Sequence, residues 1–414
     1  MRVFSGLFSQ YRGLRKEVYV LFFGRIVTNM GSMVWPMLTM ILNQKLGLEA
    51  FAISAVVVGS LLLMAPANLL GGRLADRRNK KRVIVVCDSF SILCYLVCAA
   101  VPMGYATVGL MLCAGICQSM EWPSYNALIA DLTLTEDRAR AFSLEYLGAN
   151  LGLVLSPTLA GLLFRDYLWL SFLISGLAIA CSTALIFFFV RDITPVEDRS
   201  EAASYQTAAE GLRLREVLRE NPAIALYLLF GALYGAIYTQ YNYLMPLDMG
   251  RVHGADGALI YGTVSSLNCV IVVLFTPLIT RLFARMPDVW KFFAGQCFIG
   301  AGYGLFLLLL GSVPVYYLAT LLFTWGEIFA TIGDGPYLTS RIPASHRGRI
   351  NAFVSVLATV MQGICALSVG RIYDRLSPEG AWVLVFALLF LNLVLLLVLV
   401  RADRRAYPKL YSQK

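Results

Sequence analysis

Six charged side chains stand inside long apolar segments of this chain, and they are the residues best placed to do chemistry there. They are Arg25, Asp88, Glu121, Glu145, Glu327 and Asp334. A charge in the middle of a membrane costs about 2.5–3.5 kcal/mol on insertion scales, so such residues usually face a cavity and serve a function. Burial also favours the neutral form of a carboxyl group, which suits the uptake and release of protons.

Three of these acids are candidates for proton coupling. Glu327 and Asp334 are seven residues apart, which places them on nearly the same face of one helix, and Glu121 lies in an apolar segment of the first half. The alternative for each acid is a structural role, as a carboxylate held by hydrogen bonds or by an ion pair. For Arg25 the alternatives are an ion pair with an acid or a side chain that reaches the membrane surface.

Aromatic and polar residues in the same segments are candidates for binding a substrate. Aromatic faces attract cations, and amide groups add hydrogen bonds. Besides Arg25, the candidates are Asn29, Trp35, Gln118, Tyr125, Tyr238, Tyr241, Tyr243, Asn268 and Trp325. Packing between helices is the alternative explanation for the aromatic side chains.

The composition indicates which elements must position these residues. Of the 414 residues, 58% are hydrophobic and 14% are charged, whereas about 25% of residues in an average soluble domain are charged. A membrane-spanning helix needs about 20 mostly apolar residues. Twelve stretches qualify: 18–42, 51–72, 83–103, 106–131, 141–164, 168–190, 224–248, 256–280, 292–311, 315–340, 350–373 and 381–400. We therefore predict an all-α membrane protein with twelve transmembrane helices.

The basic residues predict the orientation of these helices. Segments on the same side as the N-terminus hold 28 of the 34 Lys and Arg residues, and segments on the opposite side hold five. Because cytoplasmic loops are enriched in Lys and Arg, we expect both termini in the cytoplasm. The first apolar run is too long for a cleavable signal peptide, so we expect it to be the first span.

Weak internal similarity indicates two related halves. Three short segments recur in the same order at nearly one offset: 73–77 with 281–285, 121–123 with 334–336, and 138–140 with 347–349. Such repeats are common in transporters. We predict two pseudo-symmetric six-helix bundles, residues 1–190 and 224–414, joined by a cytoplasmic linker at 191–223. Residues 208–220 of the linker and the segment before the first span are predicted to form surface helices.

The segment Gly72–Arg82 is similar to the signature of the loop between spans 2 and 3 in the major facilitator superfamily. It has a glycine, an aspartate four residues later, then an arginine and a basic pair, with Asn79 in place of the usual later glycine. The resemblance covers essentially the whole chain and implies the major facilitator fold. It further implies that Gly72, Asp76, Arg77 and Lys80 form a cytoplasmic latch, with Asp76 capping the start of span 11. The alternative is an ordinary basic loop.

Span 5 resembles the antiporter motif of the same family. Gly148, Gly152, Pro157 and Gly161 supply small residues for close helix packing and a proline bend, although Ser156 stands where the motif has glycine. Generic packing is the alternative. One departure concerns span 4: Gln118 is followed by Ser119, and no arginine lies between Ala106 and Asp131, so the arginine-based coupling of related drug exporters does not carry over.

In overall pattern the chain resembles bacterial multidrug exporters of the superfamily. This implies a monomeric antiporter of the cell membrane that exports small amphipathic or drug-like molecules by alternating access. The proton gradient would drive it, with membrane lipids around it and without cofactor, metal or nucleic acid. The alternatives are uptake or facilitated transport of a metabolite, lipid translocation and, most remotely, a membrane-embedded enzyme. The sequence offers no HExxH, GxSxG or Cys–His pattern for enzyme chemistry.

Overall fold

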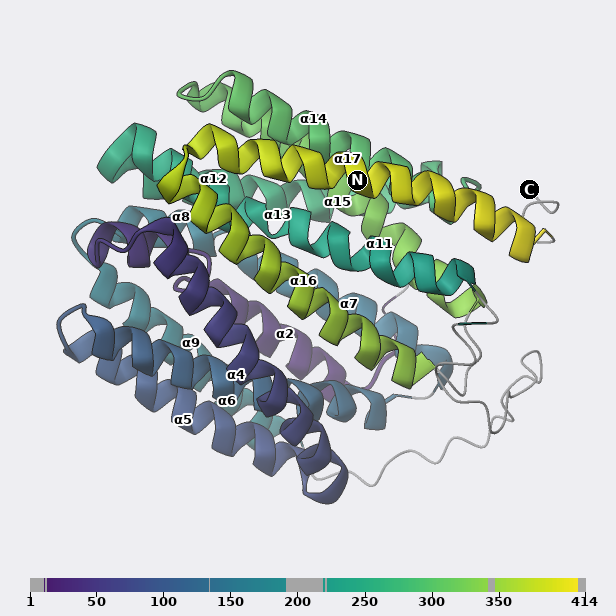
Figure 1. The fold of residues 1–414 in the computed structure, drawn as a ribbon. Coiled ribbons are helices and arrows are strands. Elements are labelled where there is room, and N and C mark those ends of the chain that lie inside the picture. The colour runs from purple at the N-terminus through teal and green to yellow at the C-terminus, as the bar shows by residue number, and fades with distance from the viewer. Residues whose placement is uncertain are drawn as a thin grey trace. The chain divides into compact units, whose positions relative to one another are not determined.

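The computed structural model describes residues 11, 13–133, 135–190, 219, 222–341 and 347–408, and its regular elements in these ranges are all helices (Figure 1). The first half contains α2 (Lys16–Met30), α3 (Leu38–Met40), the π-helix η1 (Ile41–Lys45), α4 (Ala50–Arg77), α5 (Lys80–Ala100), α6 (Tyr105–Asp131), α7 (Thr135–Leu153), α8 (Ser156–Leu163) and α9 (Leu168–Phe189). The second half contains α11 (Pro222–Tyr238), α12 (Gln240–His253), the 3-10 turn η2 (Gly254–Asp256), α13 (Gly257–Leu282), α14 (Asp288–Leu308), α15 (Val313–Arg341), α16 (Arg347–Arg375) and α17 (Pro378–Ala406).

The chain forms two compact units, which do not follow the halves strictly. The first unit comprises residues 1–47, 59–201 and 258–270, and the second comprises residues 48–58, 202–257 and 271–414. The start of α4 therefore belongs to the second unit, and the start of α13 belongs to the first. Between the two halves, α9 ends at Phe189 and α11 begins at Pro222.

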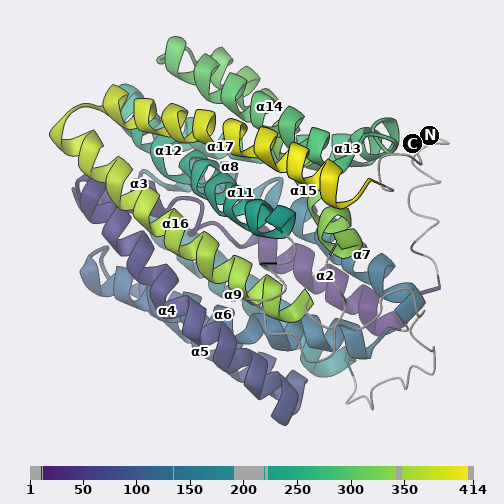
Figure 2. The ribbon, with the colours of Figure 1, turned by 45° about the vertical axis from the view of Figure 1, so that its right-hand side comes forward.

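In the first unit, α2 packs against α7 and α9, and α5 packs against α6 and α9. These contacts enclose an apolar core that includes Val18, Leu21, Ile84 and Ile186. In the second unit, α14 packs along α15, and α11 packs against α16 and α17, which Figure 2 shows side by side. The helices of each unit thus bury one apolar side against one another and leave the other side exposed, as expected for helices that lipid surrounds.

Nine helical stretches among the described residues are long and apolar enough to cross a membrane. One of them, residues 222–282, contains α11, α12 and α13 in succession. Two predicted spans are not in the set: the first, which is broken, and the fourth, which forms the single helix α6. The fold is consistent with twelve spans, but three of the predicted spans, 18–42, 141–164 and 224–248, are each divided between two or more helices.

The break in the first span follows from a close approach between α2 and α9. A Cβ atom on Gly31 would lie 2.2 Å from the Cβ atom of Ala178, so only glycine fits there. The carbonyl oxygen of Gly31 accepts a hydrogen bond from the hydroxyl group of Ser175, in place of the backbone N–H that a continuing helix would supply. Helix α2 therefore ends at Met30, and the chain becomes helical again only at Leu38.

In the loop between α4 and α5, Asn79 does not adopt the left-handed conformation that a glycine at this position could adopt. Among the described residues only glycines have positive φ. Asn79 has φ −62° and acts as the N-cap of α5, where its side chain accepts a hydrogen bond from the backbone N–H of Arg82. Asparagine is a favoured N-cap residue, so it begins the next helix rather than replacing a left-handed glycine. The side chain of Asp76 and the two predicted surface helices lie outside what the structure describes.

Candidate functional site

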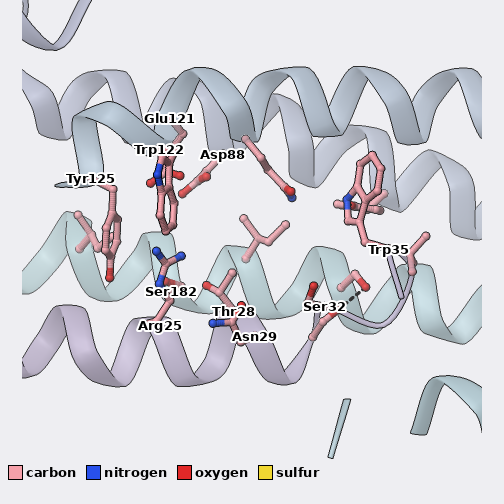
Figure 3. Close-up of a pocket in the computed structure, with 17 residues that line it drawn as sticks. Arg25, Thr28, Asn29, Ser32, Trp35, Asp88, Glu121, Trp122, Tyr125 and Ser182 are labelled. Carbon is pink, nitrogen blue, oxygen red and sulfur yellow. Dashed lines mark hydrogen bonds between the residues drawn. The ribbon is translucent and has the colours of Figure 1, made fainter. Parts of the chain in front are cut away.

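A cavity of about 220 Å³ lies inside the first unit, between α2, α5, α6 and α9 (Figure 3). Six of the residues that the sequence suggested for coupling or binding line it: Arg25, Asn29, Trp35, Gln118, Glu121 and Tyr125. Asp88 from α5 and Trp122 from α6 complete the charged and aromatic part of the wall. Residues far apart in sequence thus converge on one site, because the four helices direct their polar side chains toward the same space.

Arg25 stands at the centre of the charged part of this wall. Its guanidinium carbon lies 4.4 Å from the centroid of the Trp122 ring and 4.7 Å from that of Tyr125. Its Nε atom is 3.9 Å from Oε2 of Glu145 on α7. The arginine is therefore held mainly by two aromatic faces, an arrangement that is attractive in an environment of low polarity.

Three carboxyl groups surround this single arginine. Asp88 is buried and accepts a hydrogen bond of 2.6 Å from the hydroxyl group of Thr183. Glu145 is buried and accepts a hydrogen bond of 3.1 Å from the hydroxyl group of Tyr125. Glu121 lines the cavity and is partly exposed to it.

If all three acids were ionised, their three negative charges and the one positive charge of Arg25 would give the site a net charge of −2. Like charges in a desolvated site disfavour each other's ionised forms. The cluster of Arg25, Asp88, Glu121 and Glu145 is therefore stable only with bound protons, with a bound cation, or with both. This charge balance is the main chemical property of the cavity.

Oxygen-bearing, aromatic and aliphatic side chains cover the rest of the cavity wall. The polar ones are Thr28, Asn29, Ser32, Gln118, Ser175 and Ser182. Trp35 donates a hydrogen bond of 3.1 Å from Nε1 to the hydroxyl group of Tyr95, which fixes the end of the cavity away from Arg25. Trp35, Gln118 and Trp122 also line a second pocket of about 380 Å³. The wall can thus contact both a charged group and an apolar group of one ligand.

The candidate acids of span 10 belong to the second unit and lie in separate surroundings. Tyr238 donates a hydrogen bond of 3.0 Å to Glu327, and Tyr227 donates one to Asp334. The two predicted acids thus do not share a hydrogen-bond partner, although both accept a hydrogen bond from a tyrosine of α11. Glu327 is partly buried, whereas Asp334 is exposed.

The predicted substrate residues of the second unit are packed among other aromatic rings. Tyr241 stacks on Phe323 with ring centroids 4.3 Å apart. Trp325 contacts the rings of Phe298 and Phe275. These contacts agree with the packing alternative for Tyr241 and Trp325, and neither residue lines the cavity of the first unit.

The small residues of the antiporter-like segment make close helix contacts. A Cβ atom on Gly148 would lie 2.8 Å from the ring of Phe22, and one on Gly152 would lie 2.5 Å from the carbonyl oxygen of Ile26, both on α2. A Cβ atom on Gly161 would lie 2.7 Å from the carbonyl oxygen of Ala258. Pro157 is buried in the first turn of α8. These contacts bring α7 close to α2, the helix that carries Arg25.

The predicted latch residues have mixed surroundings. Gly72 lies within α4 with open space around its Cα atom, and Arg77 is exposed in the last turn of the helix. Lys80 forms an ion pair of 2.5 Å with Asp131 at the end of α6. Lys80 therefore links the start of α5 to the end of α6. A lysine that served only as a basic loop residue would not need this ion pair.

The sequence reasoning did not place three residues of the site. Trp122 stands out in the sequence only as part of the repeated segment 121–123, and Asp88 and Glu145 only as charged residues inside apolar segments. One signal was available for Trp122: it directly follows Glu121 and stands three residues before Tyr125, so Trp122 and Tyr125 share a helix face. No sequence signal pairs Thr183 with Asp88, which is 95 residues away.

The sequence profile of the major facilitator superfamily matches residues 21–364 of the chain. The chain belongs to the major facilitator superfamily. It is therefore a multi-pass membrane transporter and not an enzyme, and its fold is that of the superfamily. The resemblance noted in the sequence is confirmed at the level of the family.

Relatives within the superfamily differ in what they carry. A Na(+), Li(+), K(+)/H(+) antiporter of Planococcus maritimus is 24% identical and the match covers 84% of this chain and 86% of the relative. A gallate transporter of Pseudomonas putida is 29% identical over 33% of this chain and 30% of the relative. A peptide transporter of the POT type, crystallised with sulfate, superposes with a TM-score of 0.78 at 16% identity and covers 95% of both chains. The last comparison shows the fold alone.

Proposed function

We propose that this member of the major facilitator superfamily exchanges protons for small monovalent cations across the cell membrane, and that organic cations are its preferred substrates. The observation that carries the proposal is the charge of the first unit's cavity: Arg25, Asp88 and Glu121 line it, and the buried Glu145 contacts Arg25 from behind this wall. A site with this excess of acids holds either protons or a cation. The drug-like substrates expected from the sequence fit the proposal where they carry a positively charged head.

The exchange follows from competition between the two kinds of positive charge. When the cavity opens toward the cytoplasm, a cation replaces a proton held by the cluster of Asp88, Glu121 and Glu145. When it opens to the other side, protons from the more acidic compartment displace the cation. A ligand can drive such a cycle only by binding the two states differently, and the number of protons on the acids provides that difference. The direction is export, with the proton gradient as the energy source and no cofactor.

Two features of the wall favour organic cations over alkali ions. The faces of Trp122 and Tyr125 already hold a guanidinium group, and such faces recognise organic ammonium groups in the same way. Their rings also offer apolar contacts that a hydrated alkali ion cannot use.

Alkali cations are the second candidate. The hydroxyl and amide oxygens of the wall are ligands for hard cations. The antiporter of Planococcus maritimus, which is similar over most of the chain, is named for Na(+), Li(+) and K(+). Its identity of 24% leaves room for a different substrate within the same exchange of protons for cations.

Three further elements of the proposal come from the sequence. Both termini lie in the cytoplasm, and Asp76 caps the start of span 11 as a cytoplasmic latch. Glu327 of the second unit, hydrogen-bonded to Tyr238, is a second proton-binding acid, with Asp334 after it. The protein acts as a monomer that needs only its substrate and the surrounding lipid.

The test is transport by purified protein in liposomes with an imposed pH gradient. Tetramethylammonium, guanidinium, Na⁺, Li⁺ and K⁺ are offered in turn, and proton movement is followed with a trapped pH indicator. We expect organic cations to move protons most strongly, and Glu121→Gln and Asp88→Asn to remove most of the response. Glu379→Gln is the matched control, because this carboxylate is 63% exposed and belongs to the second unit. A response to neutral or anionic solutes alone would refute the proposal.

A further inference from the structure

Arg25 is held by aromatic rings more than by the acids around it. Its contact with Glu145 is 3.9 Å long, and no hydrogen bond joins its guanidinium group to any residue in the part of the chain that the structure describes. The rings of Trp122 and Tyr125 lie 4.4 and 4.7 Å from its guanidinium carbon. An arginine near three carboxyl groups normally forms short, paired hydrogen bonds with one of them, so this position of Arg25 needs an explanation.

Glu145 keeps an acceptor free beside Arg25. Its Oε2 atom accepts a hydrogen bond from Tyr125, while its Oε1 atom is buried and has no hydrogen-bond partner among the described residues. A buried carboxylate oxygen without a donor is costly. The cost is avoided if this carboxyl group carries a proton, or if Arg25 moves closer and donates to it.

We propose that the faces of Trp122 and Tyr125 form the cation subsite of the cavity, and that Arg25 occupies this subsite as a tethered cation while no substrate is bound. This inference rests on the proposed exchange of protons for cations. The ligand class is a small organic cation such as a guanidinium or quaternary ammonium group. Figure 3 shows the guanidinium group of Arg25 directed from α2 toward the Trp122 ring.

A substrate cation that takes this subsite pushes Arg25 toward Glu145. The guanidinium group then donates hydrogen bonds to both oxygens of Glu145, which must be ionised to accept them, so the proton of Glu145 passes to water in the cavity. One positive charge enters the site and one leaves, so the charge of the site is unchanged. Arg25 thereby converts the arrival of a substrate into the release of a proton.

The other charged groups around Arg25 assist this exchange without replacing Glu145. Asp88 on α5 and Glu121 on α6 are close enough to interact with its charge, and Glu145 on α7 and Tyr125 on α6 face it directly. From α9, the cavity receives the uncharged side chains of Ser175, Ile179, Ser182 and Ile186. Glu145 is the acid in reach that combines a contact with Arg25 and a free acceptor atom.

The first experiment measures the binding of tetramethylammonium to detergent-purified protein by calorimetry. Removing the tethered cation in Arg25→Gln should tighten binding about tenfold, in keeping with a single cation–aromatic contact. Arg25→Lys, which keeps a charge but has no planar guanidinium group, should give an intermediate affinity and shows that the site tolerates substitution. Arg251→Gln is the matched control and should bind as the wild type does, because Arg251 pairs with Asp248 of the second unit.

The second experiment counts protons released on binding, with a pH indicator in weakly buffered solution. The wild type should release about one proton for each cation bound, as the charge balance requires. Arg25→Gln and Glu145→Gln should each release markedly fewer. Unchanged affinity in Arg25→Gln, or unchanged proton release in Glu145→Gln, would overturn the inference even if wild-type antiport is demonstrated. Tighter binding by Arg25→Gln with no cation transport by the wild type would instead refute the proposed function and leave the subsite standing.

Discussion

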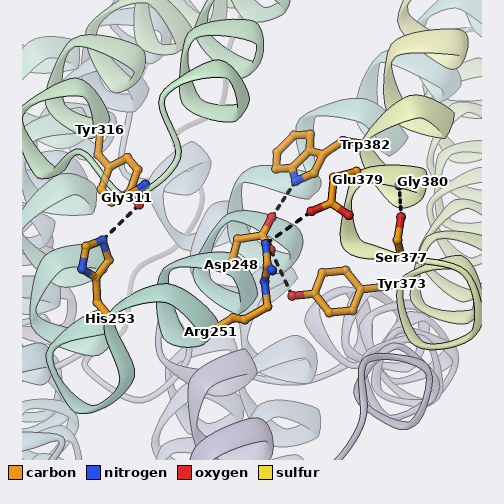
Figure 4. A network of polar contacts seen from close by, with 10 residues as sticks. All are labelled: Asp248, Arg251, His253, Gly311, Tyr316, Tyr373, Ser377, Glu379, Gly380 and Trp382. Carbon is orange, nitrogen blue, oxygen red and sulfur yellow. Dashed lines mark hydrogen bonds and ion pairs between the residues drawn. The ribbon is translucent and has the colours of Figure 1, made fainter.

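Two buried acids of this protein differ in how completely they are hydrogen-bonded. Asp248 is fully buried, and its carboxylate accepts hydrogen bonds from Trp382, Tyr373 and Arg251 at 2.6, 3.0 and 3.2 Å (Figure 4). Glu145 receives one hydrogen bond, from Tyr125, and one of its oxygens has no donor among the described residues. The first arrangement requires a permanent negative charge, whereas the second tolerates a proton. We infer that Asp248 is structural and that Glu145 is free to change its protonation state.

Amide substitutions should separate the two roles. In Asp248→Asn, the new NH₂ group would face donors that previously had an acceptor, so we expect a loss of roughly 2–4 kcal/mol in stability. In Glu145→Gln, the amide oxygen can still accept from Tyr125, so we expect a change below about 1 kcal/mol. Thermal unfolding in detergent measures both. Equal losses in the two variants would contradict the distinction between structural and exchangeable acids.

At the scale of elements, the start of α4 is fixed by a residue more than 300 positions away. The backbone N–H groups of Ala50 and Phe51 donate hydrogen bonds of 3.0 and 2.7 Å to the two carboxylate oxygens of Asp374 on α16. Tyr243 donates a hydrogen bond of 2.6 Å to the carbonyl oxygen of Ala50. A carboxylate at a helix N-terminus satisfies free N–H groups and interacts favourably with the helix dipole. These contacts explain why residues 48–58 group with the second unit.

Replacing this cap should loosen the first turns of α4. We expect Asp374→Ala to lower stability by about 1 kcal/mol, the usual cost of losing a helix cap at an exposed site, and to speed amide hydrogen exchange in residues 48–58. Glu49→Gln is a suitable control, because Glu49 is exposed at the same helix end and its side chain has no hydrogen bond to the described residues. Equal protection of residues 48–58 in wild type and Asp374→Ala would show that Asp374 does not hold this helix end.

Most elements could be predicted from the sequence, and the breaks within them could not be placed reliably. Long apolar runs are enough to predict spans, because only a helix satisfies its backbone within a membrane. The break in the first span had one local signal, Pro36, which lacks a backbone N–H. The deciding contact is between Gly31 and Ala178, which are distant in sequence. The hydropathy of a sequence does not indicate which side chains meet between helices, so it cannot locate such a break.

The candidate site was predictable in part for the same reason. Charged and aromatic residues are unusual inside apolar segments, so Arg25, Glu121 and Tyr125 can each be identified from the sequence alone. Which of them meet depends on how the helices pack. The structure joins these three residues in one cavity of the first unit. It gives Glu327 a separate partner, Tyr238, in the second unit, and a coupling role for Glu327 and Asp334 stays a prediction.

At the scale of the whole molecule, the distribution of charge carries information that the coordinates of each unit do not. The units are defined by their internal packing, which does not indicate which helix ends face the cytoplasm. The loops on one side hold 28 Lys and Arg residues and those on the other side hold five, a difference that is evident from the sequence alone. Because positive loops tend to remain in the cytoplasm, this asymmetry predicts which ends of the helices face the cytoplasm.

A pair of single cysteines in a cysteine-free background tests this orientation. Asn79, exposed between α4 and α5, should face the cytoplasm, whereas Glu379, exposed at the start of α17, should face outward. We therefore expect a membrane-impermeant maleimide to label Glu379→Cys in intact cells, and Asn79→Cys only after the membrane is opened. The nine native cysteines must be removed first, since Cys113, Cys181 and Cys297 are exposed on the helices. Labelling of Asn79→Cys from outside would reverse the topology. The proposed direction of exchange would be unaffected, because the proton gradient sets it.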